Sequence, residues 1–140
     1  MAQNFAEKMQ GTMTLIGRIS LCAIFVTSAV GLSIPNFEEV VGNMASRGIP
    51  QARAALVLTI CILVAGSLMV ILGLKARVGA AGLLVYLLAA TWLFHDFWNF
   101  QDPKRKLEAL HFLQNLSLVG AMLLIVANGS GSFSLDARKG

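Results

Sequence analysis

The chain has 140 residues, of which 56% are hydrophobic and 13% are charged, with a formal net charge of +4. Soluble domains usually carry about a quarter charged residues, so this composition disfavours an ordinary soluble protein and leaves a very apolar soluble helical bundle as the alternative. The basic residues are dispersed, and no stretch interleaves them with aromatic residues as strand-binding grooves require. We therefore expect no nucleic-acid partner.

The charged residues are confined to short stretches between long apolar runs. A membrane-spanning helix needs about 20 mostly apolar residues, and four runs meet or approach that length, at about 13–33, 52–74, 78–99 and 108–128. We predict an all-α fold: a single membrane domain over residues 1–140, built as a four-transmembrane-helix up-down bundle with the lipid bilayer as its first partner. A tight turn at residues 75–77 makes the second and third spans antiparallel.

A short amphipathic helix is predicted between the first two spans, at about residues 36–47. Asn36 and Glu39 have the spacing of a capping box, and Gly48 is a typical stop residue. An apolar stripe follows the i, i+3, i+4, i+7 rule, at Phe37, Val40, Val41 and Met44. The helix is too short to span a membrane, so we expect it at the interface or over the mouth of the bundle.

Arg18, Cys22 and Cys61 lie singly inside or at the start of the apolar runs. Arg18 stands near the start of the first span, where a long side chain can reach the headgroups, so we interpret it as a snorkelling residue and keep a buried functional role as a secondary alternative. Cys22 and Cys61 are expected to be buried thiols rather than a redox pair.

Lys and Arg counts indicate the orientation of the spans. The side that holds both termini has six (Lys8, Arg18, Lys75, Arg77, Arg138, Lys139) and the other side five (Arg47, Arg53, Lys104, Arg105, Lys106). The excess of basic residues that marks cytoplasmic loops then places both termini in the cytoplasm, by a small margin.

The polar residues nearest the apolar runs gather in one predicted helical hairpin around Pro103. On the third span, i, i+3, i+4, i+7 spacing places one group on a shared face: Trp92, His95, Asp96 and Asn99. The fourth span carries Glu108, His111, Gln114 and Asn115 in a similar pattern. Because the two histidines lie eight residues either side of Pro103, we expect them at similar depth, in a polar site between the helices.

Ionisable groups inside a membrane usually face the bundle interior and indicate function, and three chemistries could use this hairpin. A metal site would take His95, His111 and a carboxylate from Asp96 or Glu108, but the ligand set is incomplete and nothing in the spacing demands it, so the sequence predicts no metal. A proton-relay or quinone site would use a histidine oriented by a carboxylate. A structural role would need only interhelical hydrogen bonds. Trp98 and Phe97 fit an aromatic belt at the headgroups.

Several motifs, in the same order, resemble the DoxX family. They are Gly17-Arg18 and Ser28 with Gly31 in the first span, Gly48-Ile49-Pro50, Gly73-Leu74-Lys75-Ala76-Arg77, and above all Phe94-His95-Asp96-Phe97-Trp98 with His111-Phe112-Leu113-Gln114-Asn115-Leu116. The resemblance covers nearly the whole chain. It implies a four-helix bacterial membrane protein, and some family members are linked to thiosulfate:quinone oxidoreduction or to thiol and oxidative-stress defence.

Three positions depart from the pattern that such proteins commonly show. Leu32 stands in place of a lysine, Ile62 in place of a glutamate, and Gln114 in place of a lysine. Two hypotheses follow. One is a subunit of a membrane redox system in the bacterial cytoplasmic membrane, with no cofactor evident beyond a possible quinone. The other is a non-catalytic packing or anchoring subunit, joined to another membrane protein or to copies of itself.

Overall fold

The structure is a computed structural model that describes the backbone of residues 2–137 and the side chains of residues 5–137. Throughout these described residues the regular elements are helical, which confirms the all-α class. In chain order they are α1 (Ala2–Val26), a π-helical segment (Thr27–Ser33), α2 (Phe37–Ser46), α3 (Ala52–Leu72), α4 (Ala76–Phe94), a 3-10 turn (Phe97–Asn99) and α5 (Lys104–Asn128).

Four helical segments are long and apolar enough to cross a membrane, which confirms the predicted four-span fold class. They are Phe5–Ser33, Ala52–Leu72, Ala76–Asn99 and Lys104–Asn128. Large apolar side chains cover the outside of these segments, for example Ile16, Leu58, Val85 and Leu124, each more than half exposed. Soluble monomers seldom expose apolar patches of that extent, whereas lipid tails accommodate them, so the protein is a multi-pass membrane protein.

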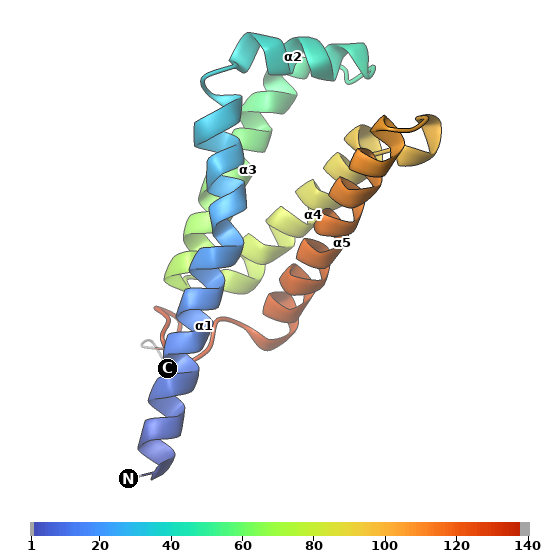
Figure 1. Ribbon diagram of the computed structural model, residues 1–140. Helices are drawn as coiled ribbons and strands as arrows, with labels where there is room; N and C mark the ends of the chain where they lie inside the picture. The colour runs from blue at the N-terminus through green and yellow to red at the C-terminus, as the bar shows by residue number, and fades with distance from the viewer. Residues whose placement is uncertain (1, 138–140) are drawn as a thin grey trace.

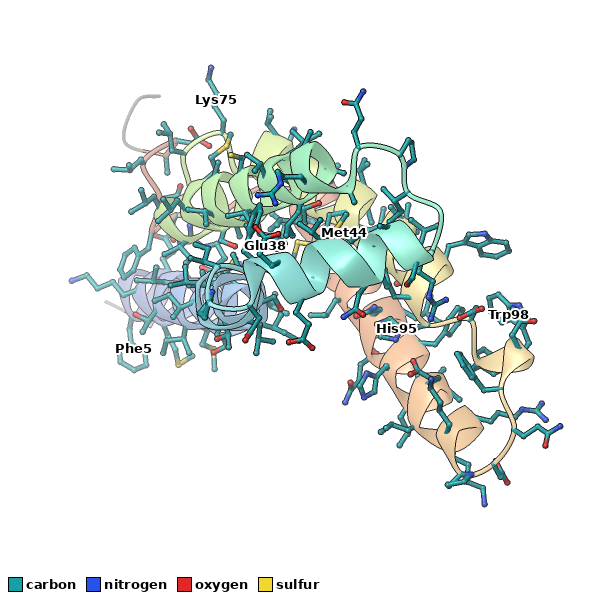
Figure 2. All side chains as sticks on the ribbon, turned by 90° about the horizontal axis from the view of Figure 1, so that it is seen from above. Phe5, Glu38, Met44, Lys75, His95 and Trp98 are labelled. Atoms are coloured by element: carbon teal, nitrogen blue, oxygen red, sulfur yellow. The ribbon has the colours of Figure 1, made fainter. Side chains whose placement is uncertain are left out.

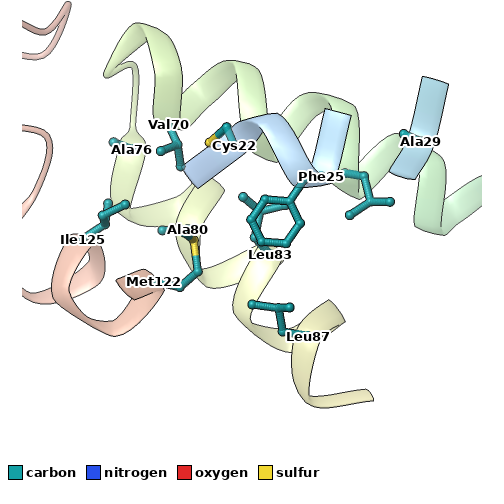
Figure 3. Close-up of a cluster of buried hydrophobic side chains, with 11 residues drawn as sticks. Cys22, Phe25, Ala29, Val70, Ala76, Ala80, Leu83, Leu87, Met122 and Ile125 are labelled. Carbon is teal, nitrogen blue, oxygen red and sulfur yellow. The ribbon is translucent and has the colours of Figure 1, made fainter. Parts of the chain in front are cut away.

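The helices pack in the order α1, α3, α4, α5, each against the next. Figure 1 shows that α4 and α5 lean away from the α1–α3 pair, so the up-down bundle is open at the end where α2 lies. Side chains from all four spanning helices meet at the other end, in a core that Figure 3 shows, formed around Cys22, Phe25, Val70, Leu83 and Met122. The predicted burial of Cys61 is wrong, because its side chain is exposed on the outer surface of α3.

Glycines set the close approach of α3 and α4. A Cβ atom on Gly79 would lie 2.7 Å from Met69 Cβ and 2.8 Å from the carbonyl oxygen of Gly66. Small residues of this kind let membrane helices come into contact over their backbones. Gly73, with a φ of 65°, and Lys75, with a φ of 47°, form the turn between the helices. The turn was predicted at residues 75–77, but α4 already begins at Ala76.

The helix α2 confirms the predicted amphipathic helix at 36–47. Its apolar stripe packs on Ala52 and Leu56 of α3, and Gly48, with a φ of 75°, ends it as expected. The predicted capping box is wrong, because the amide of Asn36 donates backwards to the carbonyl of Leu32 (3.0 Å). Figure 2, which looks down on α2, shows the helix running from the end of the first span toward the side of the α4–α5 hairpin.

Arg18 does not snorkel, so that interpretation is corrected. Its side chain is buried, at 3% exposure, and its guanidinium donates to the carbonyl oxygens of Val70 (3.2 Å) and Phe133. The segment after α5 folds back to meet it, with the amides of Leu135 and Asp136 donating to the carbonyls at the end of α3. The segment after α5 is therefore docked through Asp136, and Arg138 and Lys139, counted above for the orientation, lie outside the described residues.

Candidate functional site

The polar hairpin is formed by the end of α4 and the first turns of α5. Glu108 and His111 are three residues apart on α5 and therefore share one face. His95 is the residue directly after α4, and its backbone N–H donates to the carbonyl of Thr91 (3.1 Å). The Nδ1 atom of His95 lies 2.9 Å from Oε2 of Glu108, and the rings of His95 and His111 are 5.3 Å apart between centroids. The expected meeting of the two histidines around Pro103 is confirmed.

A cavity of about 410 Å³ lies beside these rings, between α1 with its π-helical continuation and the α4–α5 hairpin. Its polar lining at the hairpin comes from four predicted site residues, His95, His111, Gln114 and Asn115. The remaining lining is mostly apolar or aromatic, from Ile24, Phe25, Leu32, Tyr86, Leu87, Ala90 and Leu118, with Thr27 and Ser28 on the first span. An apolar pocket with a few convergent polar groups is the usual form of a small-molecule site.

The other three predicted residues do not line this cavity. The prediction that Trp92, Asp96 and Asn99 share a helical face with His95 is wrong, because α4 ends at Phe94 and the chain turns before the 3-10 segment. Trp92 is 70% exposed and its ring lies 5.4 Å from that of Trp98, which suits an aromatic belt. Figure 2 shows Trp98 at the outer edge of the hairpin.

Asp96 instead ties the hairpin to α2. Nη1 of Arg47 donates to Oδ1 of Asp96 (3.0 Å) and to the carbonyl of Leu93 (2.9 Å), and the amide of Asn99 donates to Oδ2 of Asp96 (2.8 Å). Phe94 also packs against the apolar contact between α2 and α3. The open end of the bundle is therefore bridged by α2, through a residue pair that sequence reasoning missed because 49 positions separate its members.

The first span contributes to the cavity through its π-helical segment. Thr27, Ser28 and Leu32 belong to that segment and line the cavity. A π-helix is rare, and where it interrupts an α-helix it often marks a functional site. Ser28, part of the family-like motif, thus faces the same space as the histidines, whereas Arg18, the secondary candidate, lies in a separate contact near the end of α3.

The hairpin also assembles groups that bind metals. Ligand atoms of His95, Glu108 and His111 all lie within 4.8 Å of one another. The sequence interpretation considered these residues and set them aside because the ligand set seemed incomplete. Asp96, the other carboxylate considered, faces Arg47 instead.

Fold and site together define a class of protein. It is a small multi-pass helical membrane protein with a cavity between its spans, and the polar end of that cavity is a helical hairpin that carries two histidines. The chain belongs to the DoxX family, which it matches over residues 13–96. The family resemblance of the sequence is thereby confirmed. Five of the eight hairpin residues lie beyond the matched region, so more than half of the predicted site is outside the family match: Asn99, Glu108, His111, Gln114 and Asn115.

Relatives agree with this assignment. Over 90% of its length the chain is 29% identical to inner membrane protein YphA of Escherichia coli, covering 89% of that protein. It is 28% identical to inner membrane protein YqjF of the same organism, over 93% of the chain and 94% of the relative. The chain is also 38% identical to the Surfeit locus protein 4 homolog of Schizosaccharomyces pombe, over 51% of the chain and 24% of the relative. No solved structure matches the chain.

Proposed function

We propose that the cavity binds a quinone-type ligand and that the protein is a small quinone-linked subunit of a redox system in the bacterial inner membrane. The observation that carries this proposal is the division of the cavity into an apolar body and one polar end formed by His95, His111, Gln114 and Asn115. A volume of about 410 Å³ falls within the range of roughly 300–1,000 Å³ that is typical of small-molecule sites.

The hydrogen-bonding groups at the polar end of the cavity suit both the oxidised and the reduced form of a quinone. Glu108 can only accept while it is ionised, so it holds Nδ1 of His95 protonated and leaves Nε2 of the neutral ring as an acceptor. That acceptor suits the hydroxyl of a reduced ring. The amides of Gln114 and Asn115 can donate to the carbonyl of an oxidised ring.

The cavity also borders the lipid. Ile24 and Leu32 line it and are 47% and 57% exposed on the outer surface. A ligand with an apolar tail would therefore enter from the bilayer, with its ring toward the hairpin and its tail in lipid. The two Escherichia coli relatives are named inner membrane proteins, which supports an inner-membrane location, and the Lys and Arg counts favour termini in the cytoplasm.

The experiment compares two leucine variants at asparagines of the same hairpin. Native protein, purified in mild detergent, is titrated with a short-tailed quinone by calorimetry, and its lipid extract is examined for bound quinone. Asn115→Leu removes a donor and fills the cavity, so we expect affinity to fall at least tenfold. Asn99→Leu, outside the cavity, should bind as the native protein does. Absence of binding to the native protein, or full binding by Asn115→Leu, would refute the proposal.

A packing subunit is the second candidate, and glycines on the outer surface favour it. A Cβ atom at Gly17 on α1 or at Gly120 on α5 would meet nothing within 4 Å, and Ser117 beside Gly120 is exposed. Small outward-facing residues allow a partner helix, from another membrane protein or from a second copy, to approach closely. Protein that carries no quinone but purifies within a stable larger assembly would support this role instead.

A further inference from the structure

We propose that His95, Glu108 and His111 form a binding site for one divalent transition-metal ion, of the Zn²⁺ or Fe²⁺ class, at the polar end of the cavity. The proposal depends on the arrangement of three side chains and not on the quinone. The sequence left the carboxylate open between Asp96 and Glu108, and the structure places Glu108 beside His95.

Distances among the three ligand atoms carry the argument. Zinc binds imidazole nitrogen and carboxylate oxygen at about 2.0–2.2 Å in tetrahedral geometry, which separates ligand atoms by about 3.3–3.6 Å. One pair here, Nδ1 of His95 and Oε2 of Glu108, lies at 2.9 Å, and one ligand atom from each of the three residues lies within 4.8 Å of the other two. Small side-chain rotations therefore suffice to bring them to bonding distance of a common ion.

The donor set is chemically suited to such an ion. Two histidines and one carboxylate are the ligands of known catalytic zinc sites and of non-haem iron sites that keep positions open. Glu108 and His111 also form a Glu-x-x-His pair on α5, the spacing by which helical bundles bind metals from one helix face. His95 supplies the third group from the neighbouring helix.

Burial and charge differ among the three ligands. The side chains of His95 and Glu108 are 24% and 16% exposed, whereas His111 is exposed. A carboxylate that is largely removed from water is costly without a cationic partner, and the partner of Glu108 is the His95 ring, which is cationic only when it is protonated. Lys106 pairs with Asp102 (3.3 Å) and Lys104 lies over the Phe100 ring, so a bound cation would supply a charge that neither of these lysines gives Glu108.

A metal ion bound at this site would be accessible from the cavity. Three protein ligands leave at least one coordination position for water or another ligand. Because both histidines line the cavity, that position would be reached from it. An ion bound through Nδ1 of His95 would replace the hydrogen bond to Glu108, and Nε2 would then carry the ring proton and donate toward the cavity instead of accepting.

The test uses metal alone. Chelator-treated full-length protein in mild detergent is titrated with Co²⁺, whose visible absorption reports its ligand geometry, and then with Zn²⁺ as competitor. We expect one ion per chain, and Glu108→Gln should weaken binding by about 10–100-fold or more, since even outer-shell changes have that effect. Asp102→Asn removes a carboxylate from the same turn and should leave binding unchanged.

Three results would overturn the site: no Co²⁺ binding by the native protein, unchanged binding by Glu108→Gln, or equal weakening in Asp102→Asn. Should Glu108→Gln not fold, X-ray absorption on Zn²⁺-loaded native protein decides the question. Two imidazoles without sulfur are expected, and a sulfur ligand from exposed Cys61 would refute the assignment. Glu108 does not line the cavity and Asn115 is no metal ligand, so the metal and the quinone proposals can fail separately.

Discussion

Replacement of Arg18 by methionine should destabilise the whole protein. Methionine keeps an unbranched apolar side chain but removes the guanidinium, which is the donor to Val70 on α3 and to Phe133 after α5. The buried Val70 carbonyl and the partly buried Phe133 carbonyl are then left without this partner. The variant therefore tests whether one side chain joins α1, α3 and the segment after α5.

The expected loss follows from the two long-range bonds. A hydrogen bond to a charged group contributes about 1.5–3 kcal/mol, so two would give roughly 3–6 kcal/mol. Removal of the guanidinium also relieves the cost of keeping a charge out of water. We expect a net loss of about 2–4 kcal/mol in the free energy of unfolding.

Unfolding in detergent measures that loss, and amide hydrogen exchange locates it. In Arg18→Met, exchange should rise at Leu135 and Asp136, whose amides donate to the end of α3. Arg53→Met is the matched control, because Arg53 makes an exposed ion pair with Glu38 (2.7 Å), and such pairs contribute about 0–1 kcal/mol. An Arg18→Met protein as stable as Arg53→Met, with native exchange after α5, would refute the reasoning.

Two further predictions concern helix packing. Gly79→Ala places a Cβ against the backbone of Gly66, so the free energy of unfolding should fall by about 1–3 kcal/mol as in other overpacked sites. Gly120→Ala, with open space around it, should be neutral or stabilising on the same unfolding assay, and equal effects of the two would contradict the packing described for α3 and α4. A double-mutant cycle on Arg47→Ala and Asp96→Ala should give a small favourable coupling, as expected for an exposed pair, together with faster amide exchange in α2. Zero coupling would mean that the pair does not hold α2 to the hairpin.

The spans and α2 could be predicted because their signals are local. Long uncharged runs define membrane helices by length alone, and the apolar stripe of α2 repeats with the helical period. The meeting of His95 and His111 was likewise predictable, because equal spacing from a turn places two residues at one depth of an antiparallel hairpin.

Long-range contacts and the end of α4 could not be predicted in the same way. The sequence has no Gly or Pro near Phe94 that would mark the end of the helix there. The pattern therefore predicts a helix that continues through Asn99, with Asp96 beside His95 on one face. Arg18 was misjudged because its partners are backbone carbonyls, which carry no sequence signature, one of them 115 positions away. The π-helical segment has no recognised sequence pattern either.

The docked segment after α5 has a consequence for biosynthesis. Residues 130–137 are translated after all four spans, yet they supply the Phe133 carbonyl that accepts from Arg18 in the first span. Until that stretch emerges, the Arg18 guanidinium has the Val70 carbonyl as its one long-range acceptor. We therefore expect the segment after α5 to dock last, once all four spans have been made.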